Sequence, residues 1–335
     1  MLGSCNGLVL LYDNINLCLV IVNPTTGKTL KVPKSGGGCN DAYGFGYDSS
    51  TDDYKVISFY RMSFPNSDGY FVSVYSLRNN SWRILPNCPY KQYVYHRQQG
   101  VLLNNILHFV ARNKHSTMTI VAFSLADEEF HEIELPDSFE CSLHSFRCLR
   151  CSYTCCNVFA LGGDLVAVRC DRHFYELWVM EEYRVPKSWT KLCIFENDMD
   201  LAFELFAQVS NQDLLLGNNE AQEIFIYNMD ERRCKSVAIE GCPEGDLVYN
   251  SYVESLESLE RFGSILVIEA KVFSLILCME DKLATIARGS HLFGSISIFL
   301  STPFQFLTDE GCLCIKWQKP KLATRDQMSG LQEAS

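Results

Sequence analysis

A unit of about fifty residues recurs five times along this chain of 335 residues. In each copy, short apolar runs alternate with tight turns. Equivalent positions lie about 52, 49, 55 and 48 residues apart, at Val22, Val74, Phe123, Trp178 and Ile226. A repeat of this length with four strand-like runs per copy is typical of a propeller built from four-stranded blades. The sequence therefore predicts an all-β, propeller-like fold with kelch-type four-stranded blades. Five blades are recognisable, and a sixth could begin at 247–255.

The third copy shows the pattern of runs and turns most clearly. Its strands are expected at 100–103, 106–112, 120–125 and 129–135, with Asn104-Asn105 as a hairpin turn, because Asn tolerates positive φ. The other copies repeat this order, with strands expected at 43–47, 54–60, 71–77 and 81–85, at 157–161, 165–170, 175–180 and 188–195, and at 206–209, 214–216, 223–227 and 234–239. Trp82 and Trp189 occupy matched positions in fourth strands, so we expect them to pack between blades.

The connections differ in length in a regular way. In an antiparallel meander, successive connections alternate between the two faces of the ring. The long ones, 61–70, 86–99, 113–119 and 136–156, follow second and fourth strands. They should therefore gather on one face, which becomes the expected recognition surface because binding residues concentrate on loops.

One long connection is rich in Tyr and cationic residues, which are common at protein interfaces. We take six of its residues as the candidate protein-binding site: Tyr90, Lys91, Tyr93, Tyr95, His96 and Arg97. The alternative is an ordinary solvated loop whose Tyr side chains pack down onto the domain.

Composition excludes several classes of function. The formal net charge of −11 argues against nucleic acid as the main partner, since such surfaces need excess Lys and Arg. The apolar runs 264–279 and 292–307 are interrupted or too short to span a membrane. No signal peptide is recognisable at the first residues, so we expect a reducing, cytoplasmic or nuclear location.

The closest cysteines, Cys148, Cys151, Cys155 and Cys156, form one crowded stretch rather than two metal-binding pairs, and we expect neither a metal nor a cofactor.

No catalytic motif is present in the sequence. None of the seven His lies in an H-E-x-x-H helix, and neither a G-x-S-x-G elbow nor a P-loop occurs. Asp52 and Asp53 lie in an expected hairpin turn, where Asp is favoured for local backbone bonding. We therefore expect no enzymatic activity and assign no catalytic residue.

With these runs in place, the chain resembles the F-box-associated (type 1) domain of plant F-box proteins, a group that includes the S-locus F-box-like proteins. The resemblance covers about residues 3–260. It rests on Gly3-Ser4-Cys5-Asn6-Gly7-Leu8, Asn23-Pro24-Thr25-Thr26-Gly27, Tyr43-Gly44-Phe45-Gly46-Tyr47-Asp48, Asp52-Asp53-Tyr54-Lys55-Val56, Val74-Tyr75-Ser76-Leu77, Ser81-Trp82-Arg83, Gly100-Val101, Trp178-Val179-Met180, Ser188-Trp189-Thr190-Lys191-Leu192 and Tyr252-Val253-Glu254-Ser255-Leu256.

The resemblance implies a protein-binding module that selects substrates for an SCF-type E3 ubiquitin ligase. The Skp adaptor and a cullin would be reached only through an F-box, which we do not find because residues 1–10 already read as propeller. Two alternatives remain open: a propeller-type hydrolase, and a non-functional fragment of an F-box protein.

Three regions are expected along the chain. Residues 1–260 should form the propeller domain, N-terminally truncated because it begins inside the first repeat. Residues 261–318 should form a divergent extension. Residues 319–335 are polar and have little to bury, so we expect a disordered tail.

Overall fold

The computed structural model describes most of the blades and only part of the connections. The described residues are 1–13, 17–34, 39–61, 70–85, 92–93, 98–112, 117–136, 139, 156–170, 174–196, 203–208, 212–218, 223–237, 247–251, 255–262, 274–277 and 296–300. The chain divides into the compact units Met1–Gln305 and Phe306–Ser335, and every described residue belongs to the first.

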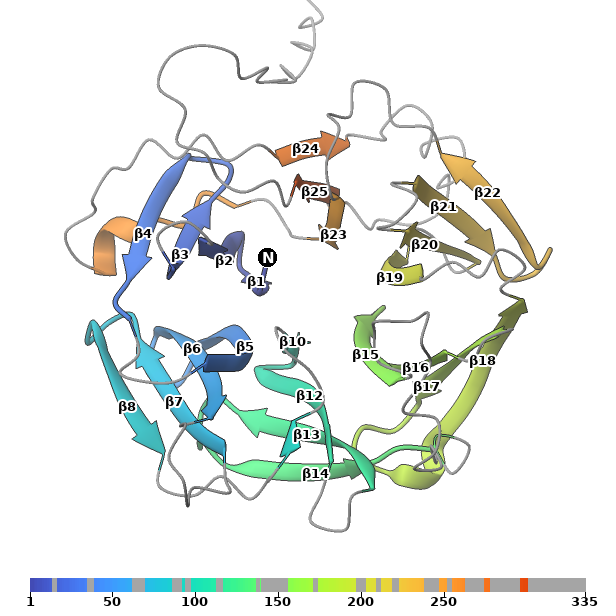
Figure 1. Cartoon of the computed structure of the whole chain (residues 1–335), viewed down its shortest axis with the longest axis horizontal. Helices are drawn as coiled ribbons and strands as arrows, with labels where there is room; N and C mark the ends of the chain where they lie inside the picture. Colours follow the sequence, from blue (N-terminus) through green and yellow to red (C-terminus); the bar gives the residue numbers. More distant parts are fainter. Residues whose placement is uncertain are drawn as a thin grey trace, which may run out of the picture. The chain divides into compact units, whose positions relative to one another are not determined.

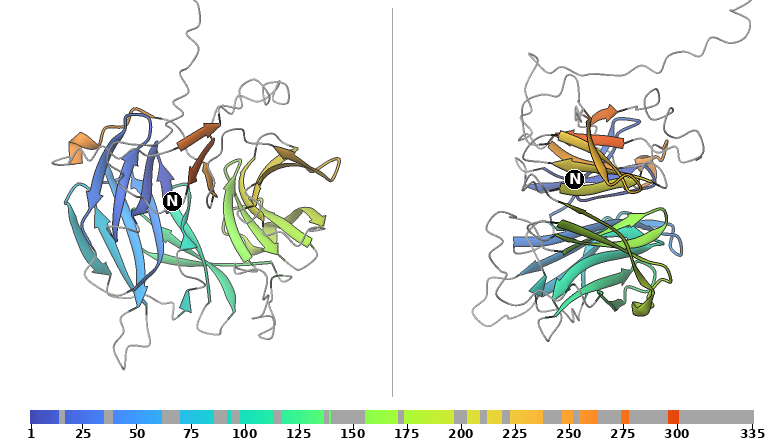
Figure 2. Two further views of the ribbon diagram at one scale, coloured as in Figure 1. Left: turned by 45° about the horizontal axis from the view of Figure 1, so that its top comes forward. Right: turned by 90° about the vertical axis from the view of Figure 1, so that its right-hand side faces the viewer.

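Five four-stranded antiparallel sheets, the blades, stand around a common centre with their first strands innermost (Figures 1 and 2). Blade 1 contains β1 (Gly3–Cys5), β2 (Leu8–Asp13), β3 (Cys18–Asn23) and β4 (Lys28–Val32). Blade 2 contains β5 (Cys39–Asp48), β6 (Asp53–Arg61), β7 (Tyr70–Ser76) and β8 (Ser81–Leu85). Blade 3 contains β11 (Val101–Leu103), β12 (Ile106–Arg112), β13 (Met118–Ser124) and β14 (Phe130–Glu134).

Blade 4 contains β15 (Cys156–Leu161), β16 (Asp164–Cys170), β17 (Phe174–Met180) and β18 (Trp189–Glu196), with a 3-10 turn, η3 (Pro186–Ser188), before its last strand. Blade 5 contains β19 (Phe203–Gln208), β20 (Asp213–Asn218), β21 (Glu223–Asn228) and β22 (Arg233–Val237). A sixth sheet has three strands in the order β23 (Leu247–Ser251), β25 (Ile296–Leu300), β24 (Ser274–Leu277). Among the described residues no helix is long and apolar enough to cross a membrane.

The predicted fold class is confirmed, including the kelch-type four-stranded blades. Each run expected in the second to fifth copies corresponds to one strand, and 106–112 and 81–85 match β12 and β8 residue for residue. Asn104 and Asn105 adopt φ values of 50° and 61°, as their hairpin requires. The sixth sheet begins at Leu247, inside the expected stretch, but it draws its other strands from distant parts of the sequence.

The hydrophobic core lies between the blades rather than inside any one of them. Because side chains alternate along a strand, neighbouring residues of one strand pack into different interfaces, each between two adjacent blades. Val56 packs with side chains of blade 1, whereas Ile57 packs with side chains of blade 3. Both faces of a blade are therefore buried, which explains why its middle strands are almost continuously apolar.

The two matched tryptophans pack between blades, as predicted. The indole Nε1 of Trp82 in β8 donates a 2.7 Å hydrogen bond to the carbonyl of Pro33, which follows β4 of blade 1. The indole of Trp189 in β18 donates a 2.9 Å bond to the carbonyl of Glu134 in β14 of blade 3. Each indole thus donates to a carbonyl at, or directly after, the end of the fourth strand of the preceding blade.

A buried ion network joins blades 2 and 3. The ammonium of Lys55, whose side chain is 8% exposed, lies 2.8 Å from Asp48, 3.0 Å from Glu128 and 2.6 Å from the carbonyl of Leu125. Arg83 of β8 also pairs with Glu128. Burial alone would raise the pKa of Asp48, but the hydrogen bonds from Lys55 and from the turn hydroxyls outweigh it and hold that pKa well below its usual range.

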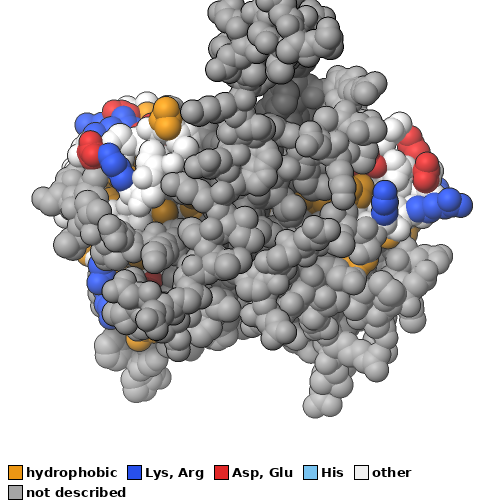
Figure 3. Space-filling model, turned by 90° about the horizontal axis from the view of Figure 1, so that it is seen from above, with side chains coloured by type: hydrophobic (Ala, Val, Ile, Leu, Met, Phe, Trp, Pro, Cys, Tyr) orange, Lys and Arg blue, Asp and Glu red, His pale blue; other side chains and the backbone are white. Residues whose placement is uncertain are grey.

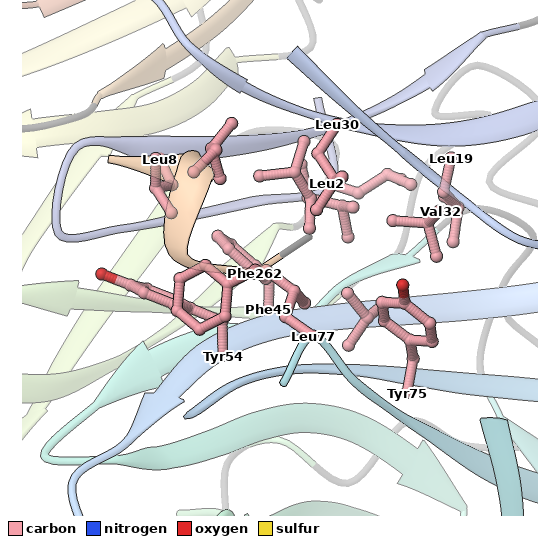
Figure 4. Packing of buried hydrophobic residues seen from close by; sticks show 14 of the residues in the cluster. Leu2, Leu8, Leu19, Leu30, Val32, Phe45, Tyr54, Tyr75, Leu77 and Phe262 are labelled. Atoms are coloured by element: carbon pink, nitrogen blue, oxygen red, sulfur yellow. The ribbon is translucent and has the colours of Figure 1, made fainter. Parts of the chain in front are cut away.

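The segment Ser255–Phe262, which we call the clasp, packs against blades 1 and 2. The side-chain amide of Asn23, the last residue of β3, donates to the carbonyls of Ser255 (3.1 Å) and Glu257 (2.8 Å). Leu259 is fully buried in the same cluster as Phe45 and Leu77, and the Phe262 ring meets the Tyr54 ring edge-on at 5.6 Å (Figure 4). The clasp therefore ties residues late in the chain to its first two blades.

The clasp includes the short turn η4 (Leu259–Phe262), which runs across the expected domain boundary after residue 260. Phe262 is 7% exposed and belongs to the core of blades 1 and 2. The division into 1–260, 261–318 and 319–335 stays a prediction. The expected tail, 319–335, and most of the expected extension lie outside the described residues.

A buried histidine joins blades 3 and 4. Nδ1 of His108 in β12 lies 3.2 Å from the carbonyl of Val101, and Nε2 lies 2.7 Å from the hydroxyl of Tyr183. A carbonyl only accepts, so Nδ1 carries the proton and Nε2 accepts from the tyrosine. Burial lowers the pKa of His108 from 6.5 to about 4, which keeps the ring neutral at neutral pH.

This histidine should make stability depend on pH. The unfolded chain binds the His108 proton below about pH 6.5, whereas the folded chain resists it down to about pH 4. The contribution of His108 to the free energy of unfolding should therefore be complete above about pH 6.5. It should fall by on the order of 3 kcal/mol as the pH drops from about 6.5 to about 4. Urea unfolding from pH 7 to 4 should show a shallower decline for His108→Gln than for the wild type. His131→Gln, at a half-buried position, is the control for the change of residue type. Parallel slopes for wild type and His108→Gln would contradict the assignment.

Candidate protein-binding interface

The strand registers separate the two faces of the ring. Tight hairpins close one face, where Leu103 pairs with Ile106 and Phe123 pairs with Phe130. At the opposite end of the same sheet, Arg112 pairs with Met118 where the second strand leads to the third. We call this second face, which also receives the connections between blades, the loop face. The registers agree with the alternation expected from connection lengths.

The connection between blades 2 and 3 is anchored on both blades at the loop face. Its strand β9 (Gln92–Tyr93) pairs with the end of β12, with Tyr93 opposite Ala111. Its strand β10 (Gln98–Gln99) pairs in parallel with β5, with Gln99 opposite Tyr43. Both partner strands belong to the inner half of their sheets, and β10 lies close to the centre in Figure 1. Strands β9 and β10 therefore attach the connection to both blades, and β10 lies near the centre of the ring.

A glycine makes this anchoring possible. The N–H of Gly100 donates a 2.7 Å bond to the carbonyl of Tyr43. A Cβ atom on Gly100 would lie 2.4 Å from the Phe109 ring and 3.2 Å from the Cα of Gly44. Only a residue without a side chain lets the chain pass between blades 2 and 3 here.

The structure places one of the six candidate site residues. Tyr93 belongs to β9 at the loop face. The other five, Tyr90, Lys91, Tyr95, His96 and Arg97, lie outside the described residues, so the site as a whole stays a prediction.

Exposed apolar side chains on this face were not singled out from the sequence. Leu17, which is 57% exposed with a φ of 49°, precedes β3 at the loop face. Ile84 (60% exposed) and Ile194 (45% exposed) lie near the loop-face ends of β8 and β18. A leucine with positive φ is energetically unfavourable for the backbone. In the sequence, only the position of Leu17 between two expected strands could have indicated that it is exposed.

Asp52 lies in the hairpin turn between β5 and β6, as predicted, but the bonds of the aspartate pair go to Tyr47 and to Arg78 of the next hairpin rather than to the adjacent backbone. Asp53 accepts a 2.8 Å bond from the backbone N–H of Arg78, and Asp52 accepts from the hydroxyl of Tyr47 (2.6 Å) and pairs with Arg78 (2.8 Å). In the part of the chain that the structure describes, no three His, Cys, Asp or Glu gather to hold a metal ion. Cys156 is buried in β15, and the three cysteines nearest to it in sequence, Cys148, Cys151 and Cys155, lie outside that part.

These features define the class of the protein: an all-β propeller of four-stranded blades with distinct hairpin and loop faces. A model of the F-box associated beta propeller domain matches residues 1–259. That match spans well over half of the chain, which therefore belongs to this family.

Individual relatives agree with the family. The chain is 27% identical to the F-box protein CPR1 of Arabidopsis thaliana over 75% of its own length and 67% of the relative. It is 31% identical to the F-box protein At3g07870 and 28% identical to the F-box/kelch-repeat protein At3g23880, both of Arabidopsis thaliana, in each case over 57% of its length. It spans 49% and 51% of these two relatives, about half of each. A chain of the nidogen–laminin complex is similar with a TM-score of 0.41 and 9% identity over 71% of this chain and 80% of that one, too weak a likeness to carry a conclusion.

Proposed function

We propose that this chain is the substrate-recognition module of an SCF-type E3 ubiquitin ligase and binds the protein to be ubiquitinated through its loop face. The family match over residues 1–259 carries the proposal, because its members are domains of F-box proteins. We assign contact with the Skp adaptor and a cullin to an F-box and none of it to the propeller. The complex would work in the cytoplasm or nucleus.

The anchored connection supports a binding role for the candidate residues. The chain between β9 and β10 is held at both ends by backbone pairing to rigid strands. A short segment fixed at both ends loses less conformational entropy on binding than a free loop. Tyr and Arg, which it carries, supply most of the energy at many interfaces.

Catalysis has less support. His108, the buried imidazole, is kept neutral by burial, and both of its ring nitrogens already have hydrogen-bond partners at the interface of blades 3 and 4. The carboxylates Asp48 and Glu128 bind Lys55, and Asp53 binds a turn. These groups all have structural partners, so we propose that the chain is not an enzyme.

Affinity purification from plant cells treated with a proteasome inhibitor tests the proposal. The wild-type chain should recover one specific protein, and the triple variant Tyr93→Ala, Tyr95→Ala, Arg97→Ala should lose it. The control triple Leu192→Ala, Arg233→Ala, Lys235→Ala changes exposed residues of outer strands β18 and β22 and should retain it. Equal recovery by both triples would contradict the assignment to the loop face, and turnover of a small ester without any partner would favour the hydrolase.

A further inference from the structure

Two strongly exposed apolar side chains lie at the same end of the interface between blades 1 and 2. Leu17 (57% exposed) directly precedes β3, and Ile84 (60% exposed) belongs to β8. In blade 1, Leu19 pairs with Val32. The same register continued by two residues places Leu17 opposite Lys34, at the loop-face end of the sheet.

The neighbouring blade brings Ile84 to the same region. The indole of Trp82 in β8 bonds to the carbonyl of Pro33, the residue before Lys34. Because side chains alternate along a strand, Ile84 points to the same side of β8 as Trp82, about 7 Å nearer the loop face. Strands β4 and β8 are neighbouring outer strands in Figure 1. Leu17 and Ile84 therefore flank residues 33–34 at the loop face.

The lysine between them has no acidic partner among the described residues. Lys34 is exposed and forms no ion pair with an acid that the structure describes. Residues 14–40 contain no Asp or Glu, so its own part of the chain supplies no opposite charge. Burial raises the pKa of the Cys18 thiol, and the ammonium groups of Lys31 and Lys34 oppose that rise. Lys34 therefore lies close to the residue that follows Leu17, and a positive charge stands beside the two apolar side chains.

Leu17 combines an exposed side chain with an unfavourable backbone conformation. Its φ of 49° lies in the left-handed region, which disfavours any residue with a Cβ atom and suits glycine. An exposed leucine gains little burial that would offset this strain. Backbone strain of this kind clusters at sites of function. The combination therefore points to a role for the Leu17 side chain outside the fold itself.

Two buried serines lie in the cross-strand row that ends at Ile84. Ser58 of β6 pairs with Ser73 of β7, and Ser73 pairs with Ile84. The serines are 0% and 2% exposed, and neither hydroxyl has a hydrogen-bond partner among the described residues. By the alternation of side chains they lie on the side of Val56 and Tyr75, which pack against blade 1. Buried hydroxyls without partners lower stability, so this end of the interface is weakly held.

The opposite end of the same interface is packed more completely. There the clasp inserts Leu259 and Phe262 into the core shared by blades 1 and 2, at 0% and 7% exposure. The interface is therefore closed at the hairpin face and weakly held at the loop face. A side chain of a partner that entered at the loop face would disrupt few favourable contacts and would bring polar atoms toward the unpaired hydroxyls.

We propose that the loop-face end of the interface between blades 1 and 2 is an anchor site for the protein partner. An apolar side chain of the partner packs between Leu17 and Ile84, and an acidic side chain next to it pairs with Lys34. This inference rests on the proposed function and adds the place and the chemistry of one contact. An apolar anchor shielded from water supplies much of the energy of a protein interface, and a charge pair beside it orients the partner.

An apolar surface with a lysine would also suit an anionic membrane, but this one is small. Peripheral membrane binding needs a broad apolar face that enters the head-group region. On the described part of the rim seen in Figure 3, apolar side chains form small separate spots among charged groups of both signs. A segment of a protein fits such a surface better than a lipid bilayer does.

Binding of labelled peptides to the 335-residue chain tests the anchor site. The probes are fluorescein-labelled octapeptides that alternate Leu with Glu, Ser with Glu, or Leu with Lys, followed by fluorescence anisotropy. The Leu–Glu peptide should bind at least about tenfold more tightly than the other two, since only it supplies both the apolar and the acidic side chains. The variant Lys34→Glu, Ile84→Ser should weaken its binding at least about tenfold.

Blade 4 supplies the matched control. Lys187 is exposed before β18, and Leu192 in β18 is 42% exposed. Lys187→Glu, Leu192→Ser changes the net charge equally and also removes one exposed apolar side chain. It should leave the affinity for the Leu–Glu peptide within about twofold, because distant exposed charges are screened.

Leu17→Gly separates binding from folding. Glycine relieves the left-handed strain, so the midpoint of urea unfolding should stay the same or rise. Affinity for the Leu–Glu peptide should nevertheless fall about tenfold, because the apolar anchor loses one of its two contacts. A side chain kept only for the fold would show the reverse, with lower stability and unchanged affinity.

Four results would overturn the proposal: no preference for the Leu–Glu peptide over the other two, equal loss of affinity in the control variant, full affinity in Leu17→Gly, or binding of the chain to phosphatidylserine vesicles but not to the Leu–Glu peptide. None of these measurements depends on recovery of a natural partner. Partner recovery without Leu–Glu peptide binding therefore refutes the anchor site alone, and peptide binding without partner recovery refutes the ligase function alone.

Discussion

Leu259→Ala should lower the free energy of unfolding by about 2–5 kcal/mol, and Phe262→Ala by about 3–5 kcal/mol. Both side chains are buried between blades 1 and 2, at 0% and 7% exposure, so truncation leaves a cavity in the joint that the clasp covers. The two residues share one cluster, so the double variant should not lose the full sum of the single effects. Urea unfolding followed by tryptophan fluorescence measures each value.

Leu256→Ala is the control for the clasp. Leu256 lies in the same segment and is 81% exposed, so its truncation should change stability by less than about 0.5 kcal/mol. A loss below about 1 kcal/mol for Leu259→Ala would mean that the clasp is peripheral and that the first blades hold together without it.

Lys55→Met should lower the free energy of unfolding by about 3–5 kcal/mol. Methionine keeps most of the side-chain volume but removes the ammonium. Asp48 is then left with an uncompensated negative charge between blades 2 and 3, and Glu128 keeps only its pair with the exposed Arg83. The carbonyl of Leu125 also loses its 2.6 Å hydrogen bond. The loss of stability therefore comes from the Asp48 carboxylate and the Leu125 carbonyl, which lose their hydrogen-bond donor, rather than from lost packing.

Lys28→Met provides the matched comparison, because Lys28 also pairs with a glutamate, Glu260. That pair is exposed, with side chains 40% and 61% accessible, so its loss should cost less than about 1 kcal/mol. Equal effects of the two substitutions in chemical denaturation would contradict the central role of the buried network.

The blades were predictable because the information that specifies them is local. Apolar alternation, Asn and Gly at turns and a period near fifty residues each act over a few positions, and they place β6, β12 and β16 within two residues of the observed bounds. The packing role of Trp82 and Trp189 followed from their matched positions. Lys55, by contrast, reads as an ordinary polar residue in a strand, since its acidic partner Glu128 lies 73 residues away.

Features that depend on distant contacts were not predictable. The Asn23 side chain and the clasp backbone are about 230 residues apart, and nothing in either motif alone indicates that one binds the other. The parallel pairing of β10 with β5 carries no periodic signal because only two residues take part. The sixth sheet joins strands 247–251, 274–277 and 296–300 in an order that no repeat predicts. For the candidate binding site, the sequence predicted the connection and its residue types, and the structure adds the strand pairings of Tyr93 and Gln99 at its two ends.

Site-specific photo-cross-linking tests the recognition role of the loop face most directly. Thr117 precedes β13 at the loop face, and Thr25 lies in the hairpin turn between β3 and β4 on the opposite face; both are exposed threonines. A photoreactive amino acid at Thr117 should covalently capture the same protein that affinity purification recovers, whereas the same amino acid at Thr25 should capture none of it. Capture of that protein from Thr25 alone, or equally from both positions, would contradict binding through the loop face.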